Sequence, residues 1–184
     1  MLFPEKEIRL KEGRTAFLRS PLPSDAEAAL EFMKITAEET PFLLRSPEEC
    51  TLTLEDEIKF LTRFPVDPNA AMILCFVDGV LAGNCQVVRK NKVKNRHRAS
   101  IGIALKQQFW GLGIGTALFE EMIAIAESWG LMQLELEVIE GNDRAMALYR
   151  KMGFETVSFV PNAIRMPDGS FVREFLMVKS LKNK

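Results

Sequence analysis

The stretch that most constrains the fold reads Gln108-Phe109-Trp110-Gly111-Leu112-Gly113-Ile114-Gly115-Thr116. Its three glycines lie between an alternating apolar segment and an amphipathic one, which predicts a strand, a glycine-rich turn and a helix N-terminus. Such a turn directs unpaired backbone N–H groups and the positive end of the helix dipole to one spot. Because a phosphate or pyrophosphate suits that spot, the turn indicates a phosphorylated cofactor.

Other interpretations of these glycines have to be weighed. A dinucleotide-binding fingerprint, G-x-G-x-x-G, would start at Gly111 and would need a glycine where Thr116 stands. A P-loop would need a lysine that the stretch does not contain. Glycines also allow a strand and a helix to pack closely, and an isolated G-x-G is equally typical of that role. The turn therefore indicates either an anion site or close packing.

The segments around the turn alternate between strand and helix patterns. Before it, residues 99–105 alternate apolar and small residues, which predicts a strand antiparallel to the one before it. After it, apolar residues recur at helical spacing up to Gly130, at Leu118, Met122, Ile125 and Trp129. The remaining pattern predicts a strand at 134–138, a short helix at 142–152 stopped by Gly153, and final strands at 154–160 and 171–178.

The first part of the chain carries a strand pattern and two helix starts. Residues 15–19 are an expected strand, and Ser24 with Glu27 three residues later predicts a capping box at the start of a helix. Thr53 with Asp56 predicts the start of a second helix in the same way. Its expected apolar face consists of Leu54, Ile58, Leu61 and Phe64.

A hairpin separates these helices from the glycine-rich stretch. Asp78-Gly79 joins the apolar runs 71–77 and 80–88, and this pair is typical of a two-residue turn in which both residues have positive φ angles. Strands and helices thus alternate along the whole chain, which predicts the α/β class. A length of 184 residues fits one domain, spanning residues 1–184.

Composition places the chain among folded proteins of mixed charge. With 47% hydrophobic and 27% charged residues, it is neither too polar to fold nor apolar enough for a membrane protein. The net charge of -1 provides no overall field that favours nucleic acid or anionic lipid. The apolar runs are far shorter than the roughly 20 residues of a spanning helix. We therefore predict neither a nucleic-acid partner nor a membrane segment.

The cysteines and the histidine bear on metals and location. Cys50, Cys75 and Cys85 have no C-x-x-C spacing, and His97 is the only histidine, so we predict no metal site. An odd number of thiols, and a start that reaches charged residues before any apolar segment of signal-peptide length, indicate a reducing compartment. The cytoplasm is the expected location.

Tyr149, the only tyrosine, follows Asn142 by seven residues on the expected short helix. Two helical turns place them about 10 Å apart along one face. Asn142 suits an N-cap, and Tyr149 suits a half-buried packing position. Alternatively, this face borders the cofactor, and the phenol donates its proton to a leaving group.

Three glutamates, Glu135, Glu137 and Glu140, lie in or just after the expected strand at 134–138. Alternation places Glu135 and Glu137 on the face opposite Leu134. That face is either solvated or opens on a substrate cleft. In a cleft, a carboxylate with a raised pKa could accept a proton from an amine.

Charge is segregated along the chain. Residues 89–98 contain six Lys or Arg but no aromatic residue that could stack on a base, so a solvated hairpin loop is favoured over a nucleic-acid patch. Residues 25–57 contain ten acidic and two basic side chains. Solvent-facing helix surfaces account for this excess, and an acidic mouth that attracts cationic amines is the second interpretation.

Together, the strand at 101–105, the glycine-rich stretch and a later motif resemble the GCN5-related N-acetyltransferase superfamily. The later motif reads Asn142-Asp143-Arg144-Ala145-Met146-Ala147-Leu148-Tyr149-Arg150-Lys151-Met152-Gly153-Phe154 and fits N-x-x-A-x-x-L-Y-x-x-x-G-F, which is specific to the family. The resemblance covers about residues 71–178. It implies a single domain with a central mixed, twisted sheet of about six to seven strands flanked by helices. Acetyl-CoA would lie in the splay between two parallel strands.

The resemblance also implies which residues bind acetyl-CoA. The strand edge for the pantetheine arm and the acetyl carbonyl corresponds to Ile103, Ala104 and Leu105. The pyrophosphate loop corresponds to Trp110, Gly111, Leu112, Gly113, Ile114, Gly115 and Thr116. The first residue of that loop is usually Gln or Arg in the family, and here it is Trp110. Asn142 corresponds to the asparagine that approaches the pantetheine arm.

The implied activity is direct transfer of an acetyl group from acetyl-CoA to a primary amine in a ternary complex, without a metal. Tyr149 matches the general acid for the CoA thiolate, and Glu137 matches the general base of one branch of the family. The acceptor is left open between a small cationic amine and a protein N-terminus, and a homodimer is a further expectation. The alternatives are a non-catalytic acyl-CoA sensor and, less favoured by the net charge, a nucleic-acid module using residues 89–98.

Overall fold

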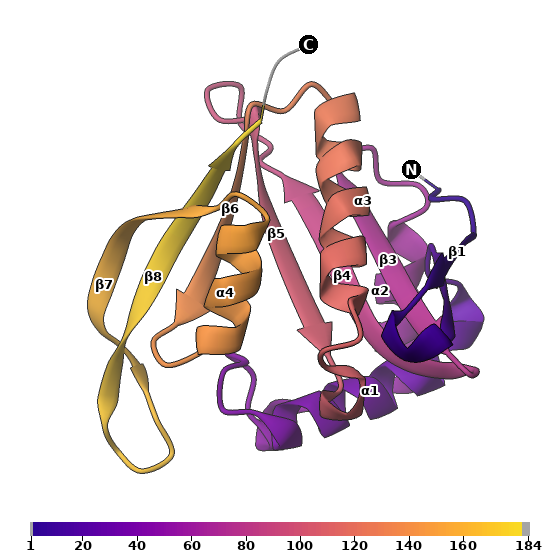
Figure 1. Ribbon diagram of the computed structural model, residues 1–184, viewed down its shortest axis with the longest axis horizontal. Coiled ribbons are helices and arrows are strands. Elements are labelled where there is room, and N and C mark those ends of the chain that lie inside the picture. Colours follow the sequence, from indigo (N-terminus) through magenta and orange to yellow (C-terminus); the bar gives the residue numbers. More distant parts are fainter. Residues whose placement is uncertain (1, 182–184) are drawn as a thin grey trace.

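Eight strands form one mixed sheet in the computed structural model, which describes residues 2–181 (Figure 1). Their order is β1-β2-β3-β4-β5-β6-β8-β7, and only β5 and β6 pair in parallel. The strands are β1 (Lys6–Arg9), β2 (Thr15–Arg19), β3 (Ala70–Val77), β4 (Val80–Arg89), β5 (Arg98–Leu105), β6 (Gln133–Ile139), β7 (Glu155–Arg165) and β8 (Phe171–Ser180). The α/β prediction is confirmed, with one strand more than expected. β1 was missed because its four residues include a single apolar side chain, Ile8.

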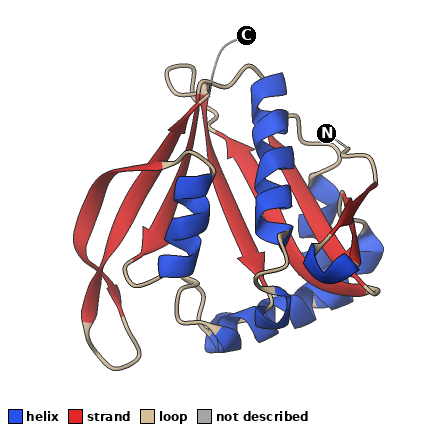
Figure 2. Cartoon of the chain, viewed as in Figure 1, coloured by secondary structure: helices blue, strands red, loops and turns tan. Residues whose placement is uncertain are grey.

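Four helices cover the two faces of this sheet (Figure 2). They are α1 (Ala26–Glu39), α2 (Leu54–Arg63), α3 (Ile114–Ser128) and α4 (Asp143–Lys151). Helices α3 and α4 pack in one core with alternate residues of the strands, whereas α1 and α2 pack in a second core on the other face. Strand β3 contributes Ile73 to the first core and Met72 and Leu74 to the second. Burial on both faces explains why this strand is a continuous apolar run.

The parallel strands β5 and β6 separate after a short paired segment. Their register contains only three residue pairs and ends at Ser100 with Glu135. Figure 1 shows the two strands close together at one end and far apart at the other, with α1 crossing below the open end. The predicted splay between two parallel strands is therefore confirmed.

A buried carboxylate holds the strands together where they still pair. Glu135 is 6% exposed, forms an ion pair with Lys90 at 2.7 Å and a second one with Arg98. Burial opposes its ionisation, but the hydrogen bonds from Lys90 and Arg98 leave the pKa of Glu135 below its usual value. Glu135 thus fits neither of the two expected environments, a solvated face or a substrate cleft. Its two partners, Lys90 and Arg98, are two of the six basic residues in segment 89–98.

The turn and capping predictions have different outcomes. Asp78 and Gly79 have φ angles of 50° and 79°, as a hairpin turn of this kind requires, and Thr53 caps α2. The capping box at Ser24 is wrong, because α1 starts two residues later at Ala26. The preceding residues form a 3₁₀ turn in which the Asp25 carboxylate accepts the backbone N–H of Leu22 at 2.7 Å.

The face that α2 buries also differs from the predicted one. Leu61 and Phe64 are buried as expected, but Leu54 and Ile58 are exposed. Glu57 is buried in their place at 3% exposure, and its Oε2 atom has no hydrogen-bond partner within residues 2–181. Burial raises the pKa of Glu57, an effect that the charge of Arg45 partly offsets. The helix has therefore buried a carboxyl group that the charge of Arg45 compensates only in part.

We expect Glu57→Gln to stabilise the protein near neutral pH by about 1–2 kcal/mol, because it removes a poorly solvated charge while keeping the side chain's shape. A raised pKa means that the wild type loses stability as pH rises through that pKa. The gain in Tm, about 2–5 °C at pH 7, should therefore vanish below the usual pKa of glutamate. Thermal unfolding at both pH values checks this, with the exposed Glu31→Gln as the control. A gain that is equally large in acid would contradict the assignment.

Candidate active site

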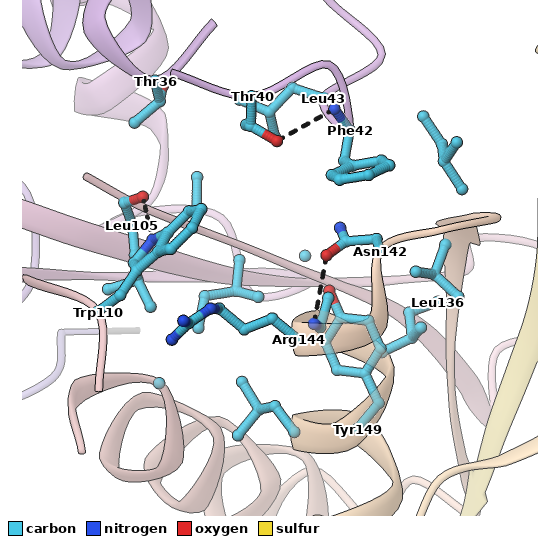
Figure 3. Close-up of a pocket in the computed structure, with 18 of the residues that line it drawn as sticks. Thr36, Thr40, Phe42, Leu43, Leu105, Trp110, Leu136, Asn142, Arg144 and Tyr149 are labelled. Atoms are coloured by element: carbon cyan, nitrogen blue, oxygen red, sulfur yellow. Dashed lines mark hydrogen bonds between the residues drawn. The ribbon is translucent and has the colours of Figure 1, made fainter. Parts of the chain in front are cut away.

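The splay between β5 and β6 contains a cavity of about 510 Å³. Several parts of the chain line it: the ends of β5 and β6, the glycine turn before α3, one face of α4, the end of α1 with the loop that follows it, part of β8, and Lys11 from the connection between β1 and β2. Figure 3 shows Trp110, Asn142, Arg144 and Tyr149 around this space, with Phe42 above Asn142. The cavity thus brings together residues that lie far apart in the sequence.

The glycine turn at the start of α3 has features that suit both of the roles considered for it. Gly111 and Gly113 have φ angles of 82° and 97°, and a Cβ atom on either one would meet nothing within 4 Å. Space is therefore open in front of the turn, where the N-terminus of α3 is available to an anion. At Gly115, by contrast, a Cβ atom would lie 2.9 Å from the Leu148 side chain, so this glycine permits close packing.

Two members of the predicted pyrophosphate loop place their side chains elsewhere. Leu112 and Ile114 are buried in the core with α3, and neither lines the cavity. These residues can contribute backbone groups only. Because alternate residues of the turn point into the core, the loop is anchored while its glycines border the cavity.

Cationic side chains gather at the same end of the cavity. The guanidinium of Arg144 lies 4.7 Å from the centre of the Trp110 ring, and the indole Nε1 donates to the Leu105 carbonyl at 3.0 Å. Lys151 donates to the Thr116 hydroxyl at 3.2 Å, and Lys11 also lines the cavity. Helix N-terminus and cations together make this end suited to phosphate groups.

The edge of β5 forms one wall of the cavity. Ile103, Ala104 and Leu105 all line it, as the resemblance implies. On its other edge β5 pairs with β4 in unbroken register as far as Leu105 with Gly83. Beyond Ser100 the edge toward β6 has no partner strand, so its backbone groups are available to a ligand.

Helix α4 presents Asn142 and Tyr149 to the cavity, as predicted. The side-chain oxygen of Asn142 caps the helix by accepting the Ala145 N–H at 3.3 Å. The cap is thus confirmed, and the amide nitrogen of Asn142 remains available to a ligand. Asn142 lies at the N-terminus of α4 and Tyr149 near its C-terminus, and Figure 3 shows the Tyr149 ring reaching toward Asn142.

Tyr149 is held in a largely apolar environment. Its ring packs against Phe119 at 5.5 Å and Phe154 at 6.3 Å between ring centres, and it is 8% exposed. Burial, with a smaller effect from Cys85, raises the pKa of Tyr149 to about 12. Within the described chain its hydroxyl has no hydrogen-bond partner. The phenol therefore stays protonated at neutral pH and has a proton to donate.

Carboxylates gather at the end of the cavity formed by β6 and β8. Glu137 is exposed and lines the cavity, and so does Glu174. In the strand register Glu137 faces Leu176 and Ile139 faces Glu174, so the two glutamates are diagonal neighbours. Burial and the charge of Glu137 raise the pKa of Glu174. Glu174 was not predicted as a site residue, because the strand register between β6 and β8 cannot be read from either segment alone.

Glu140, the third glutamate of the group, belongs to another environment. Its carboxylate forms an ion pair with Arg173, which also donates its backbone N–H at 3.0 Å. These hydrogen bonds lower the pKa of Glu140 to about 2. Neither residue lines the cavity, and Glu140 is no candidate for proton transfer.

The loop after α1 closes the cavity opposite α4. Phe42 lies 3.6 Å from where a Cβ atom of Gly141 would be, and Leu43 and Leu44 are further lining residues. The end of α1 is fixed, because the Glu39 carboxylate accepts the backbone N–H of Gln107 at 2.6 Å. The run Phe42-Leu43-Leu44 is apolar although it lies outside any predicted helix or strand, and this is the sequence signal for its place in the cavity wall.

Residues 2–181 contain no group of three or more His, Cys, Asp or Glu side chains placed to hold a metal ion. Over the same range, none of the helices combines the length and apolarity needed to cross a membrane.

This arrangement defines an α/β protein whose binding cavity lies between two splayed parallel strands. Residues 31–154 match the Acetyltransferase (GNAT) family, and the chain belongs to this family. L-amino acid N-acetyltransferase AaaT from Escherichia coli (strain K12) is 25% identical over 113 residues, which are 61% of this chain and 69% of AaaT.

Solved structures of the family share the fold. The crystal structure of a GNAT-family acetyltransferase from Streptococcus pneumoniae has a TM-score of 0.85 at 28% identity, covering 90% of this chain and 99% of that one. A phosphinothricin acetyltransferase from Sinorhizobium meliloti, solved in complex with acetyl-CoA, has a TM-score of 0.78 at 18% identity, covering 90% and 88%. The second likeness concerns the fold alone.

Proposed function

We propose that this chain is an N-acetyltransferase that moves the acetyl group of acetyl-CoA to a primary amine, with residues 1–184 acting as one domain. One observation carries the proposal. A single cavity has the glycine-rich turn at one end, the carboxylates of Glu137 and Glu174 at the other, and the protonated Tyr149 of α4 in its wall. Those are the groups that a thioester with a long phosphorylated arm and an attacking amine would need.

The residues present fit acetyl-CoA. Open space in front of Gly111 and Gly113, with Arg144 and Lys151 nearby, suits the phosphates. The free edge of β5 at 103–105 and the amide nitrogen of Asn142 suit the pantetheine arm. When bound, acetyl-CoA supplies an activated acetyl group with a thiolate as its leaving group.

The residues of this chain would then divide the proton transfers. Glu137 takes the proton of the attacking amine as the N–C bond forms, and Tyr149 gives its proton to the sulfur as the C–S bond breaks. A backbone N–H near Leu105 stabilises the negative charge on the acetyl oxygen. After the reaction Glu137 carries an extra proton and Tyr149 lacks one, and proton exchange with water restores both residues.

Direct transfer between the two substrates is favoured over an acetylated enzyme. All three cysteines lie within the described residues, and none of them lines the cavity. Burial raises the pKa of Cys75 to about 12 and also raises the pKa of Cys85, so both thiols stay protonated. We expect initial-rate lines that intersect when both substrates are varied; parallel lines would contradict direct transfer.

Several expectations about partners and location remain part of the proposal. The acceptor is a small cationic amine or a protein N-terminus, and no metal or nucleic acid takes part. A homodimer is supported by exposed apolar side chains on the edge strand β7, namely Val157, Phe159 and Val160. The cytoplasmic location stays a prediction.

Calorimetric titration with acetyl-CoA, followed by a panel of amines monitored for thiol release, tests the proposal. We expect micromolar binding and thiol release with one class of amine. Binding without release from a broad panel would favour the non-catalytic sensor. Absence of binding would contradict both.

A further inference from the structure

The cavity separates its charges along its length. Its three cationic lining residues, Lys11, Arg144 and Lys151, belong to the end formed by the glycine turn. The backbone N–H of Lys11 donates to the Leu112 carbonyl at 3.1 Å, Lys151 donates to Thr116, and Arg144 stacks on Trp110. The phosphates of the proposed acetyl-CoA would pair with these three cations, which would then be unavailable to the acceptor.

The opposite end carries negative charge only. Glu137 and Glu174 are its ionisable lining residues in the described chain. The nearest candidate cation on β8, Arg173, forms an ion pair with Glu140 and stacks on Phe159 and Phe175 outside the cavity. A carboxylate entering this end would meet two like charges and no cationic partner among the lining residues.

The remaining walls at this end are largely apolar. Phe42 packs over Gly141, just beyond the end of β6, and Leu43, Leu44 and Ile139 also line the space. Two hydroxyl groups also border this space: Thr40 of the loop accepts the N–H of Phe42 at 3.2 Å and keeps its own hydrogen to donate, and Thr36 of α1 donates to the Phe32 carbonyl at 2.8 Å. An apolar substituent therefore fits beside the acceptor's amine.

From this placement we propose that the acceptor is a primary amine with an apolar substituent and without a carboxylate on the carbon next to the nitrogen, selected by Glu174 together with Glu137. This inference rests on the proposed function and narrows it. It also separates this chain from its relative AaaT, whose name describes an enzyme for L-amino acids. Glu174 is the specificity residue, whereas Glu137 handles the proton.

Matched acceptors test the inference directly. Thiol release is measured with 2-phenylethylamine against phenylalanine, and with 3-methylbutan-1-amine against leucine. We expect kcat/KM for each amine to exceed that for the matching amino acid by about 10–100-fold, since like charges oppose the carboxylate. Phenylalanyl-glycyl-glycinamide is a third acceptor, with an apolar side chain and no carboxylate. Turnover above that of the small amines identifies a peptide N-terminus as the natural acceptor, and turnover below it identifies a small molecule.

Variants of Glu174 connect the preference to this residue. Glu174→Lys should reduce the amine-to-amino-acid ratio by at least about tenfold, because it supplies a cation for the carboxylate. Glu174→Gln, which keeps the side chain's shape, should reduce the ratio less and serves if the lysine variant does not fold. Glu155→Lys makes the same charge change on β7 outside the cavity and should leave the ratio unchanged.

The outcomes separate this inference from the function on which it rests. Equal kcat/KM values for amines and amino acids would overturn the inference while acetyl transfer stands. The same holds if the amine-to-amino-acid ratio is the same in Glu174→Gln, Glu174→Lys and Glu155→Lys. Thiol release with none of the acceptors would overturn both.

Discussion

Replacing Tyr149 with phenylalanine is expected to lower kcat by about 10²–10⁴-fold, the usual effect of removing a general acid. Burial raises the pKa of Tyr149 to about 12, so the hydroxyl carries a proton throughout the neutral range. The thiolate that leaves acetyl-CoA needs that proton as its negative charge develops. Steady-state thiol release with saturating acetyl-CoA measures the change.

The affinity for acetyl-CoA and the stability provide the controls for Tyr149→Phe. Phenylalanine keeps the ring contacts with Phe119 and Phe154, so Tm should stay within about 2 °C of the wild type. The Kd for acetyl-CoA should change little, because the hydroxyl acts as the sulfur departs. A variant with normal kcat would show that the leaving thiolate obtains its proton elsewhere.

Gly113→Ala should weaken acetyl-CoA binding by about 30–100-fold. Gly113 has a φ angle of 97°, in which an L-residue is strained by about 1–2 kcal/mol, and its new Cβ would project into the open space in front of the turn. That strain lowers the stability of the variant, whereas its affinity falls because the Cβ prevents the close approach between backbone and phosphate. Calorimetric titration with acetyl-CoA gives the Kd of the variant.

Gly169→Ala provides the matched control for this substitution. Gly169 has a φ angle of 85° in the turn between β7 and β8, also with nothing within 4 Å of a Cβ atom, and it does not line the cavity. Both variants should therefore lose similar stability, but only Gly113→Ala should lose affinity. Equal Kd values for the two variants would place the phosphates away from the turn.

Much of the fold follows from local sequence patterns. Three features depend only on neighbours within a few residues and can be predicted from them: the hairpin at Asp78-Gly79, the cap at Thr53 and the apolar stripe of α3. The errors arise where a competing local contact or tertiary packing decides. The Asp25 carboxylate binds the backbone of a 3₁₀ turn and delays α1, and packing rotates α2 so that Glu57 is buried instead of Ile58.

The candidate site divides in the same way. Glycines, Asn142 and Tyr149 belong to compact motifs, and the structure brings them to one cavity. Residues contributed by single side chains from distant elements were not predictable, because their positions depend on strand register and loop path. Glu174 and Phe42 are the clearest cases. Both lie at the end of the cavity proposed to bind the acceptor amine, and neither belongs to a recognisable sequence motif.

A crystal structure of the protein with acetyl-CoA would test the central claim most directly. We expect the phosphates on the backbone N–H groups of residues 111–116, the pantetheine arm along the edge of β5 at 103–105, and the thioester sulfur within hydrogen-bond reach of the Tyr149 hydroxyl. Acetyl-CoA bound outside the splay, or with its sulfur beyond the reach of Tyr149, would contradict it.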